Sequence, residues 1–275
     1  MAKSVRQTDD GPTNDGQTDN DLQHRPWPLP GGPWVMAQRW HDLLFAHWPV
    51  PATDVRALIP AGLEIDTFGG LAWLGVVPFR MSNVRLRGTP ALPWLSFFPE
   101  LNVRTYVVHD GKPGVWFFSL DAGNSTAVVI ARQWFHLPYF HASMHIAERD
   151  AWAHYRSTRT HRGAAPAALQ AKYRPISPAQ IARPGTLEYF LTERYCLYTA
   201  DARGRLLRGE IHHGPWPLQI AEAEFAENTM ASAAGIALPA GKPLLHFAKR
   251  QDVVVWSPKK IIQGVNPSLH RVYHS

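Results

Sequence analysis

The sequence predicts an α+β fold dominated by strands, an antiparallel β-barrel or sandwich with a few short helices packed on it. About ten to twelve short segments alternate apolar and polar residues, as half-buried strands do. Turn signals such as Gly69-Gly70 and Asp110-Gly111 join neighbouring segments as hairpins. Only about three or four segments show the helical spacing of apolar residues.

The composition is that of a globular protein. The 275 residues are 45% hydrophobic and carry a formal net charge of +6. The arginines are scattered rather than clustered, so we expect no nucleic-acid partner. No run of about eighteen apolar residues occurs, so we expect no membrane partner. A polar N-terminus and a single cysteine, Cys196, which we expect to be buried, indicate a cytoplasmic protein.

We expect one domain, over residues 34–258. Residues 1–33 are rich in Asp, Thr, Gln, Gly and Pro, which predicts a disordered tail. Residues 259–275 are polar and are expected to form a loose C-terminal tail.

The alternation predicts each element in turn. In the first half, strands are expected at residues 36–48, 63–68, 71–81, 100–108 and 115–120. A short helix between the first two is capped by Thr53 or Asp54 and ended by Pro60. In the second half, strands are expected at residues 144–159, 194–199, 205–212, 218–225, 244–247 and 252–256. Short helices are expected at residues 186–191 and 227–234, the latter with Gly235 as its C-cap.

Residues 125–145 organise the domain. Residues 125–135 are mostly apolar, which predicts a helix buried on most of its circumference. Pro138 ends that helix. Beyond it, Tyr139, Phe140 and nearby histidines place polar-tipped side chains on an apolar scaffold, which is typical of a pocket.

Three of these histidines could be metal ligands: His136, His141 and His145. Their spacing does not match one helical face, and no carboxylate follows closely until Glu148. We therefore predict hydrogen-bonded or exposed histidines, with neither a metal nor a cofactor.

Glu100 opens a strand whose polar face includes Arg104. Two interpretations stay open. The two residues could form an ion pair at the end of the strand. Alternatively, Glu100 could be an acid, a base or a substrate orienter inside a barrel mouth.

Several segments also carry a family resemblance. Arg39, residues 54–60 (Asp-Val-Arg-Ala-Leu-Ile-Pro), Glu100 and residues 131–140 (Ala-Arg-Gln-Trp-Phe-His-Leu-Pro-Tyr-Phe) resemble the acetoacetate decarboxylase-like superfamily. Leu-Pro-Tyr-Phe-His-Ala, Leu-Thr-Glu-Arg-Tyr (191–195) and His-Gly-Pro-Trp-Pro-Leu (213–218) are similar to its uncharacterised bacterial YqjF-like branch. The resemblance covers about residues 35–258 and implies that superfamily's β-barrel fold.

The decarboxylases of this superfamily use a lysine that forms a Schiff base with a keto acid. Arg132 and Pro138 fall on the motif's arginine and proline, but its two lysine positions read Tyr139 and Phe140. Neither side chain can form an imine, so a Schiff-base decarboxylase is not expected. A later Pro-Lys-Lys, at residues 258–260, lies at the predicted tail and is not expected to be catalytic.

The resemblance still implies a ligand pocket, lined by residues other than the missing lysines. Arg39 would take the place of the arginine that meets the substrate carboxylate, and Glu100 that of the acidic residue near the reacting carbon. Tyr139 would point where the amine was, as a hydrogen-bond donor or weak acid. The other expected ligand-binding residues are Arg104, His136 and His141. Such a set suits a small carboxylate or carbonyl ligand.

Three functions are compatible with these features. The one we favour is a protein that binds a small carboxylate or carbonyl metabolite in a barrel pocket. The second is an enzyme of a non-Schiff-base type, with Tyr139 as acid and Glu100 or a histidine as base, in enolisation or hydration chemistry. The third is a protein-interaction scaffold whose aromatic loop, with Trp94, Phe97 and Phe98, contacts another protein.

Overall fold

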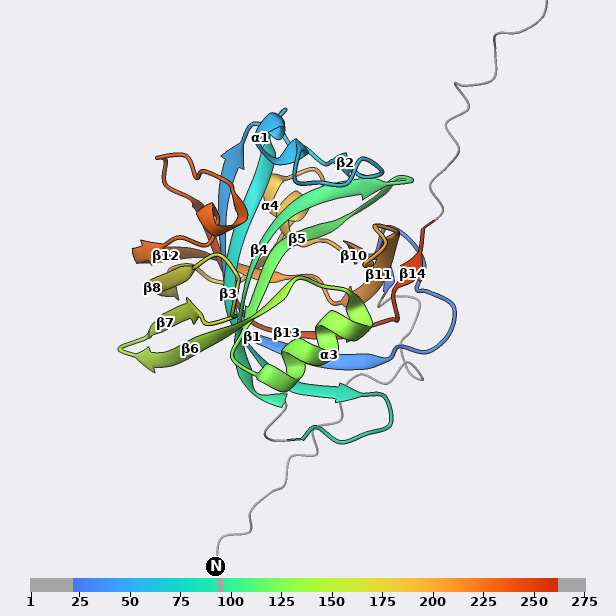
Figure 1. The fold of residues 1–275 in the computed structure, drawn as a ribbon. Helices are drawn as coiled ribbons and strands as arrows, with labels where there is room; N and C mark the ends of the chain where they lie inside the picture. The colour runs from blue at the N-terminus through green and yellow to red at the C-terminus, as the bar shows by residue number, and fades with distance from the viewer. Residues whose placement is uncertain (1–21, 93–95, 262–275) are drawn as a thin grey trace, which may run out of the picture.

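The computed structural model describes residues 22–92 and 96–261, and strands dominate them (Figure 1). The α+β, β-dominated class is confirmed. The strands of the first half are β1 (Met36–Val50), β2 (Glu64–Ile65), β3 (Ala72–Leu86), β4 (Phe98–His109) and β5 (Lys112–Ala122). Those of the second half are β6 (Tyr139–Arg149), β7 (Trp152–Arg159), β8 (Ala168–Pro175), β9 (Gln180–Ile181), β10 (Cys196–Ala200), β11 (Leu206–His213), β12 (Pro217–Asn228), β13 (Leu244–Val255) and β14 (Lys259–Lys260). The helices are α1 (Ala52–Arg56), α3 (Ser125–Phe135) and α4 (Leu187–Thr192), with a 3-10 turn at Ser232–Ala234.

Hydrogen bonds join the described strands into one sheet, in the order β14-β11-β10-β5-β6-β7-β8-β12-β13-β1-β3-β4-β2, with β9 beside β12. Most neighbours are antiparallel, but β5 runs parallel to both β6 and β10. Two additional pairings, β4 with β5 and β11 with β13, link strands that lie apart in this order. These two pairings connect strands from distant positions in the order, so the sheet folds back on itself and hydrogen-bonds to its own strands.

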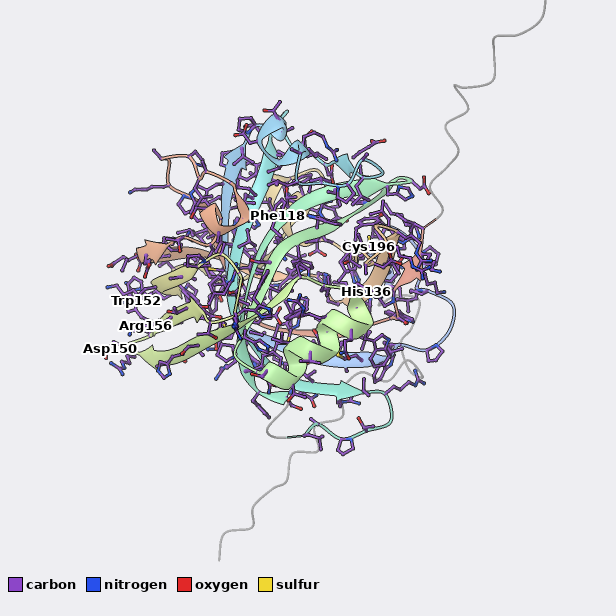
Figure 2. The ribbon with its side chains drawn as sticks, viewed as in Figure 1. Phe118, His136, Asp150, Trp152, Arg156 and Cys196 are labelled. Atoms are coloured by element: carbon purple, nitrogen blue, oxygen red, sulfur yellow. The ribbon has the colours of Figure 1, made fainter. Side chains whose placement is uncertain are left out.

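Tight turns connect the hairpins as the sequence predicts. Asp110 and Gly111 join β4 to β5 with φ angles of 48° and 69°. Two-residue hairpin turns require this left-handed geometry, and Asp-Gly adopts it readily. Asp150 and Ala151 join β6 to β7 in the same way, at the hairpin that Figure 2 labels.

Two predictions about the C-terminal half are wrong. Residues 244–247 and 252–256, predicted as two strands, form the single strand β13, because β13 pairs with β1 on both sides of its polar middle. Residues 227–234 do not form a helix. Instead β12 continues to Asn228, which pairs with Leu169 of β8, and only a 3-10 turn follows, with Gly235 as its left-handed C-cap at φ 80°.

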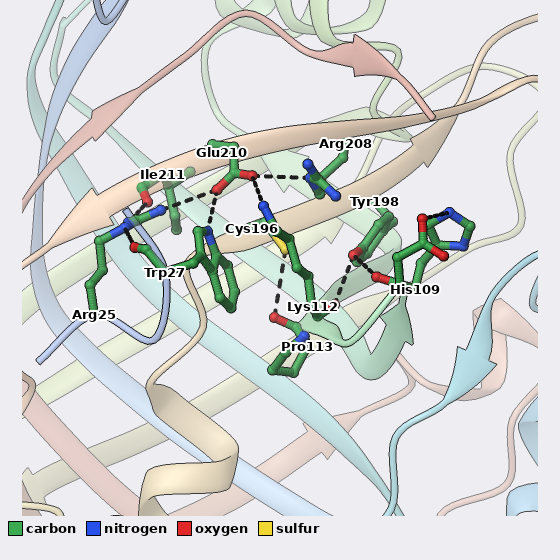
Figure 3. A network of polar contacts seen from close by, with 11 residues as sticks. Arg25, Trp27, His109, Lys112, Pro113, Cys196, Tyr198, Arg208, Glu210 and Ile211 are labelled. Carbon is green, nitrogen blue, oxygen red and sulfur yellow. Dashed lines mark hydrogen bonds and ion pairs between the residues drawn. The ribbon is translucent and has the colours of Figure 1, made fainter. Parts of the chain in front are cut away.

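The predicted tails are shorter than expected. Residues 22–33 are predicted as part of a disordered N-terminal tail, yet Arg25 is buried and its Nη1 donates to Ile211 O (Figure 3). Trp27 Nε1 donates to Glu210 Oε2 at 2.8 Å. Composition misses this packing because both partners are on β11, far along the chain. Residues 1–21 lie outside the described residues.

At the other end, Lys259–Lys260 form β14 and pair with Leu207 and Arg208 of β11. These two lysines are therefore part of the sheet rather than of a loose tail. Residues 262–275 lie outside the described residues.

The central strands separate two apolar regions. One face of β1, β3 and β4 packs Leu44, Val76 and Leu101 against the β7, β8 and β12 side. The other face carries residues such as Phe45 and Phe79, and α3 packs over it. This second region contains the cavity.

Candidate ligand-binding site

A cavity of about 590 Å³ is enclosed mainly by β1, β3, β4 and α3. Aromatic side chains make much of its wall: Trp40, Phe45, Phe79, Phe117, Trp134 and Trp216. Its polar lining residues include Gln38, Arg85, Glu100, Asn102, Arg104, Tyr139, Arg194 and His213. An apolar wall with a few polar groups is the usual make-up of a small-molecule site.

Strand β4 supplies three of the polar groups. Glu100, Asn102 and Arg104 are two residues apart, so the pleat turns all three to the cavity. Leu101 and Val103 between them enter the core on the other face. The interruption in pairing between β4 and β5 lies next to Arg104, which pairs with Phe117.

Glu100 and Tyr139 are in direct contact. The Tyr139 hydroxyl donates to Glu100 Oε2 at 2.8 Å, and both side chains are buried. Burial raises the pKa of Glu100 to about 8, because the desolvation of its carboxylate outweighs the hydrogen bond from Tyr139. Burial likewise raises the pKa of Tyr139 well above its usual value, and the adjacent Glu100 adds to the effect. The ion pair between Glu100 and Arg104 that the sequence left open is not among the contacts of the described residues.

The chain after α3 fixes the position of Tyr139. The helix covers residues 125–135 as predicted, and His136 then adopts a left-handed φ of 53°. Arg132 Nη1 donates back to Tyr139 O at 2.6 Å, and Tyr139 pairs with Leu120 where β6 starts beside β5. The arginine and the strand pairing together hold the backbone that carries the phenol.

The prediction that α3 is buried on most of its circumference is wrong. Val128 and Phe135 are buried, but Val129 is 46% exposed and Trp134 is 41% exposed. The helix packs on the sheet from one side only, so its outer apolar residues remain in contact with solvent. Trp134 also reaches the cavity wall and therefore lies at its mouth.

A buried ion pair supports the same region. Arg159 donates to both oxygens of Asp121, from Nε at 2.8 Å and Nη2 at 2.7 Å. The Arg159 guanidinium carbon lies 4.1 Å from the centre of the Phe140 ring. Asp121 also adds to the raised pKa of Glu100. The pair thus braces the start of β6 and favours the protonated form of Glu100.

Arg104 lines the cavity without a carboxylate partner among the described residues. Its Nη2 makes one long hydrogen bond, 3.4 Å, to Leu191 O, and its Nε has no hydrogen-bond partner in the described structure. The guanidinium lies over the rings of Phe45 and Tyr106, at 5.3 and 5.7 Å. A half-buried guanidinium with one long hydrogen bond and a buried Nε that lacks a partner is suited to an external acceptor.

Two more buried polar atoms in the cavity wall lack partners among the described residues. They are Asn102 Oδ1, an acceptor, and Trp216 Nε1, a donor. Arg194 is different, because its Nη1 pairs with Asp66 at 2.5 Å and its Nε donates to Phe190 O. Sequence reasoning missed Asn102, although its position between Glu100 and Arg104 at a spacing of two could have identified it.

The structure does not bring Arg39 to the cavity. Gln38 and Trp40 line the cavity, so Arg39 between them lies on the opposite face of β1. Its Nε pairs with Asp252 Oδ1 at 2.6 Å across the β1–β13 ladder. Of the two predicted ligand-binding arginines, Arg39 and Arg104, only Arg104 lines the cavity.

The three histidines singled out in the sequence, His136, His141 and His145, are not part of the cavity wall. His136 is exposed at the end of α3, where Figure 2 labels it. The ring of His141 stacks on that of His161, with centres 5.1 Å apart, and His145 is exposed on β6. Among the described residues, no three His, Cys, Asp or Glu side chains are placed to hold a metal ion.

Cys196 is buried, as predicted. Burial raises the pKa of its thiol to about 12, which keeps it protonated at neutral pH. Of the predicted aromatic loop, Phe97 is 63% exposed while Phe98 is buried in the cavity wall, and Trp94 lies outside the described residues.

The arrangement of strands is that of the acetoacetate decarboxylase-like proteins. A structure of the enduracididine biosynthesis enzyme MppR complexed with pyruvate aligns with a TM-score of 0.58 and 11% identity, over 85% of this chain and 93% of that one. The acetoacetate decarboxylase of Legionella pneumophila aligns with a TM-score of 0.56 and 12% identity, over 91% of this chain and 98% of that one. At these identities the likeness concerns the fold.

The chain belongs to DUF2071, a family of uncharacterised conserved proteins whose model matches residues 37–252. It is 50% identical to the uncharacterised protein YqjF of Bacillus subtilis (strain 168) over 232 residues, which are 84% of this chain and 95% of that protein. The predicted YqjF-like branch is therefore confirmed. Within residues 22–92 and 96–261, no helix has the length and apolar character needed to cross a membrane.

Proposed function

We propose that the protein binds a small organic acid that carries a carbonyl or hydroxyl group, with Arg104 holding the carboxylate and Glu100 the second oxygen. The observation that carries this proposal is the poorly satisfied Arg104 guanidinium in an apolar cavity. A carboxylate can accept two parallel hydrogen bonds from a guanidinium, and an apolar surrounding strengthens that pairing.

Glu100 is suited to the second oxygen. With a pKa of about 8 it is mainly protonated at neutral pH, so its carboxyl group can donate as well as accept. Tyr139 already donates to Oε2, which leaves the acid proton for a ligand carbonyl. Glu100 and Arg104 are four residues apart on one strand, or about 13 Å between Cα atoms, and their long side chains can converge on the carboxylate and the neighbouring oxygen of one ligand.

The fold relatives support an oxo acid. MppR, a protein with the same fold, is complexed with pyruvate in one of its structures. In this chain, the described residues of the cavity wall include no lysine, which supports binding or chemistry without a Schiff base. We also retain the barrel as a proposal. Pairing of β4 with β5 supports it, because that link joins two parts of the sheet around the cavity.

Thermal unfolding against a panel of 2-oxo, 3-oxo and 2-hydroxy acids tests the proposal. An acid at about one hundred times its Kd should stabilise the wild type by about 2.7 kcal/mol. Arg104→Gln should reduce that stabilisation to about 0.4–1.4 kcal/mol, as expected for binding that is ten to one hundredfold weaker. Arg39→Gln is the matched control, since Arg39 is also a strand arginine but faces away from the cavity. Stabilisation that survives undiminished in Arg104→Gln and disappears in Arg39→Gln would overturn the assignment.

A second candidate function is proton transfer next to the carbonyl of the bound acid. The contact between Tyr139 and Glu100, whose pKa is about 8, favours it, because a general base works best when its pKa lies near the working pH. The protein in D₂O should then exchange the α-hydrogens of a bound oxo acid faster than buffer, as followed by proton NMR. If the acid binds without exchange, or if Glu100→Gln exchanges its hydrogens equally fast, proton transfer by Glu100 is ruled out and only the binding function remains.

A further inference from the structure

The cavity is larger than the acid group needs. Sites of about 300–1,000 Å³ hold drug-sized ligands, and this cavity measures about 590 Å³. Glu100, Asn102 and Arg104 occupy only a part of its wall. The chemical character of the remaining wall should therefore indicate which other groups the ligand has. This inference rests on the proposed function.

The strand register separates a polar part of the wall from an apolar one. In the β3–β4 ladder, Arg104 pairs with Gly75 and Glu100 with Phe79, so the polar groups lie along this half of β3. Further along β3, Met81 pairs with Phe98 of β4 on one side and with Trp40 of β1 on the other. At the end of β3, Leu86 pairs with Met36 of β1.

The second half of this path is mostly apolar, with Gln38 and Arg85 among its polar lining residues. Its wall comes from the ends of β1 and β3 and from α3, and includes Met36, Trp40, Met81, Val84, Trp134 and Leu137. Two breaks in the alternation, at Asp42 and Asn83, have φ angles of 52°. They let residues on both sides of each break, such as Trp40 and Leu43, face the cavity.

The exposure of the side chains gives the direction. Glu100 and Asn102 are buried, whereas Trp134 and Leu86, at the apolar end, are 41% and 43% exposed. Glu100 and Asn102 thus lie at the inner end, and the mainly apolar wall leads to the mouth. A ligand that enters acid group first would leave its other end against Trp134.

We infer that the ligand is an oxo acid with an apolar tail of about five to ten carbon atoms, whose carboxylate and carbonyl meet Arg104 and Glu100 and whose tail lies along the Trp40, Met81 and Trp134 wall. A three-carbon acid would contact only the polar end of the cavity and leave the apolar wall uncovered. A longer acid would also remove the apolar wall from water, which favours binding in proportion to the buried area.

A homologous series of 2-oxo acids tests the tail. Isothermal titration of pyruvate, 2-oxobutanoate, 2-oxohexanoate and 2-oxooctanoate should show affinity rising about threefold with each methylene group. The two acids differ by about five methylene groups, so the gain from pyruvate to 2-oxooctanoate should reach about 240-fold. Equal affinity along the series, with every member still dependent on Arg104, would overturn the tail while leaving the proposed function intact.

A variant at the mouth provides the second measurement. Trp134→Ala should weaken 2-oxooctanoate about tenfold and leave pyruvate unchanged. Trp152→Ala is the control, because Trp152 lies in the β6–β7 hairpin, away from α3 (Figure 2). The methyl ester of 2-oxooctanoate keeps the tail and loses the charge, so it should bind poorly. If the ester binds as well as the acid and Arg104→Gln has no effect, the proposed function itself fails.

Discussion

The hydroxyl group of Tyr139 donates a 2.8 Å hydrogen bond to Glu100 in a place where both side chains are buried. The phenol stabilises the Glu100 carboxylate, whereas burial destabilises it, and burial has the larger effect on the pKa. The two residues come from different ends of the β4–β5–α3–β6 segment. Their contact therefore depends on the parallel pairing of β5 with β6.

The raised pKa of Glu100 predicts that this residue makes stability fall as pH rises. Between about pH 4.5 and 8 the native state keeps the Glu100 proton, while the unfolded state has released it. The native state thus binds more protons, and the free energy of unfolding decreases by up to about 1.4 kcal/mol per pH unit from this group. Urea unfolding of wild type and Glu100→Gln at pH 5, 6 and 7 should show wild type losing stability relative to the variant. A constant difference, with exposed Glu64→Gln as control, would contradict the buried neutral acid.

Removing the phenol hydroxyl should raise the pKa of Glu100 further. Tyr139→Phe deletes the hydrogen bond that favours the carboxylate, and it should cost about 1 kcal/mol of stability. Carbon-13 NMR of labelled glutamate carboxyl groups measures the titration directly. Tyr155→Phe is the matched control, because Tyr155 donates to the backbone oxygen of Glu100 rather than to its carboxyl group. A lower Glu100 pKa in Tyr139→Phe would disprove this role.

The buried pair of Asp121 and Arg159 should be far more important to stability than an exposed pair. Arg159→Met leaves the Asp121 carboxylate buried without its partner, and we expect a loss of about 3–5 kcal/mol in urea unfolding. The pair of Arg174 and Glu222 is about 40% exposed on each side, so Arg174→Met should cost at most about 1 kcal/mol. Equal losses in the two variants would show that the Asp121 site is not desolvated as described.

Arg25 should hold residues 22–33 against β11. Its guanidinium reaches both Ile211 O and Glu210 (Figure 3). It also lies over the ring of Tyr195, at 4.9 Å from the ring centre. Arg25→Gln should lower stability by about 2 kcal/mol and make this segment cleavable by a protease of broad specificity such as subtilisin. Exposed Arg203→Gln should behave as wild type. If Arg25→Gln is cleaved at the same rate as wild type, Arg25 does not hold the segment, and residues 22–33 behave as the disordered tail that the sequence predicts.

Local patterns predicted much of the fold. The hairpin at Asp110-Gly111 and the helix over residues 125–135 appear where the sequence places them, because turn chemistry and a following proline act over a few residues. Contacts between residues far apart in the sequence cannot be predicted from such local patterns. The packing of Arg25 and Trp27 depends on Glu210, and the continuity of β13 depends on its pairing with β1.

The candidate site shows the same division. Glu100, Arg104 and Tyr139 reach the cavity, since alternation along β4 and the end of α3 can be read locally. Arg39 does not, because the side of a strand that faces a cavity depends on breaks such as Asp42. His136 and His141 fail for a related reason: the left-handed turn at His136 directs the chain so that Tyr139, rather than a histidine, enters the cavity wall.

The most direct test of the account is the affinity of 2-oxooctanoate for wild type and Arg104→Gln, measured by isothermal titration at pH 7. A hydrogen-bonded charge pair contributes about 1.5–3 kcal/mol, so the variant should bind about ten to one hundredfold more weakly. Arg39→Gln, measured beside it, should bind as wild type does. Equal binding by wild type and Arg104→Gln, or no binding by either, would contradict the assignment of Arg104 as the carboxylate receptor.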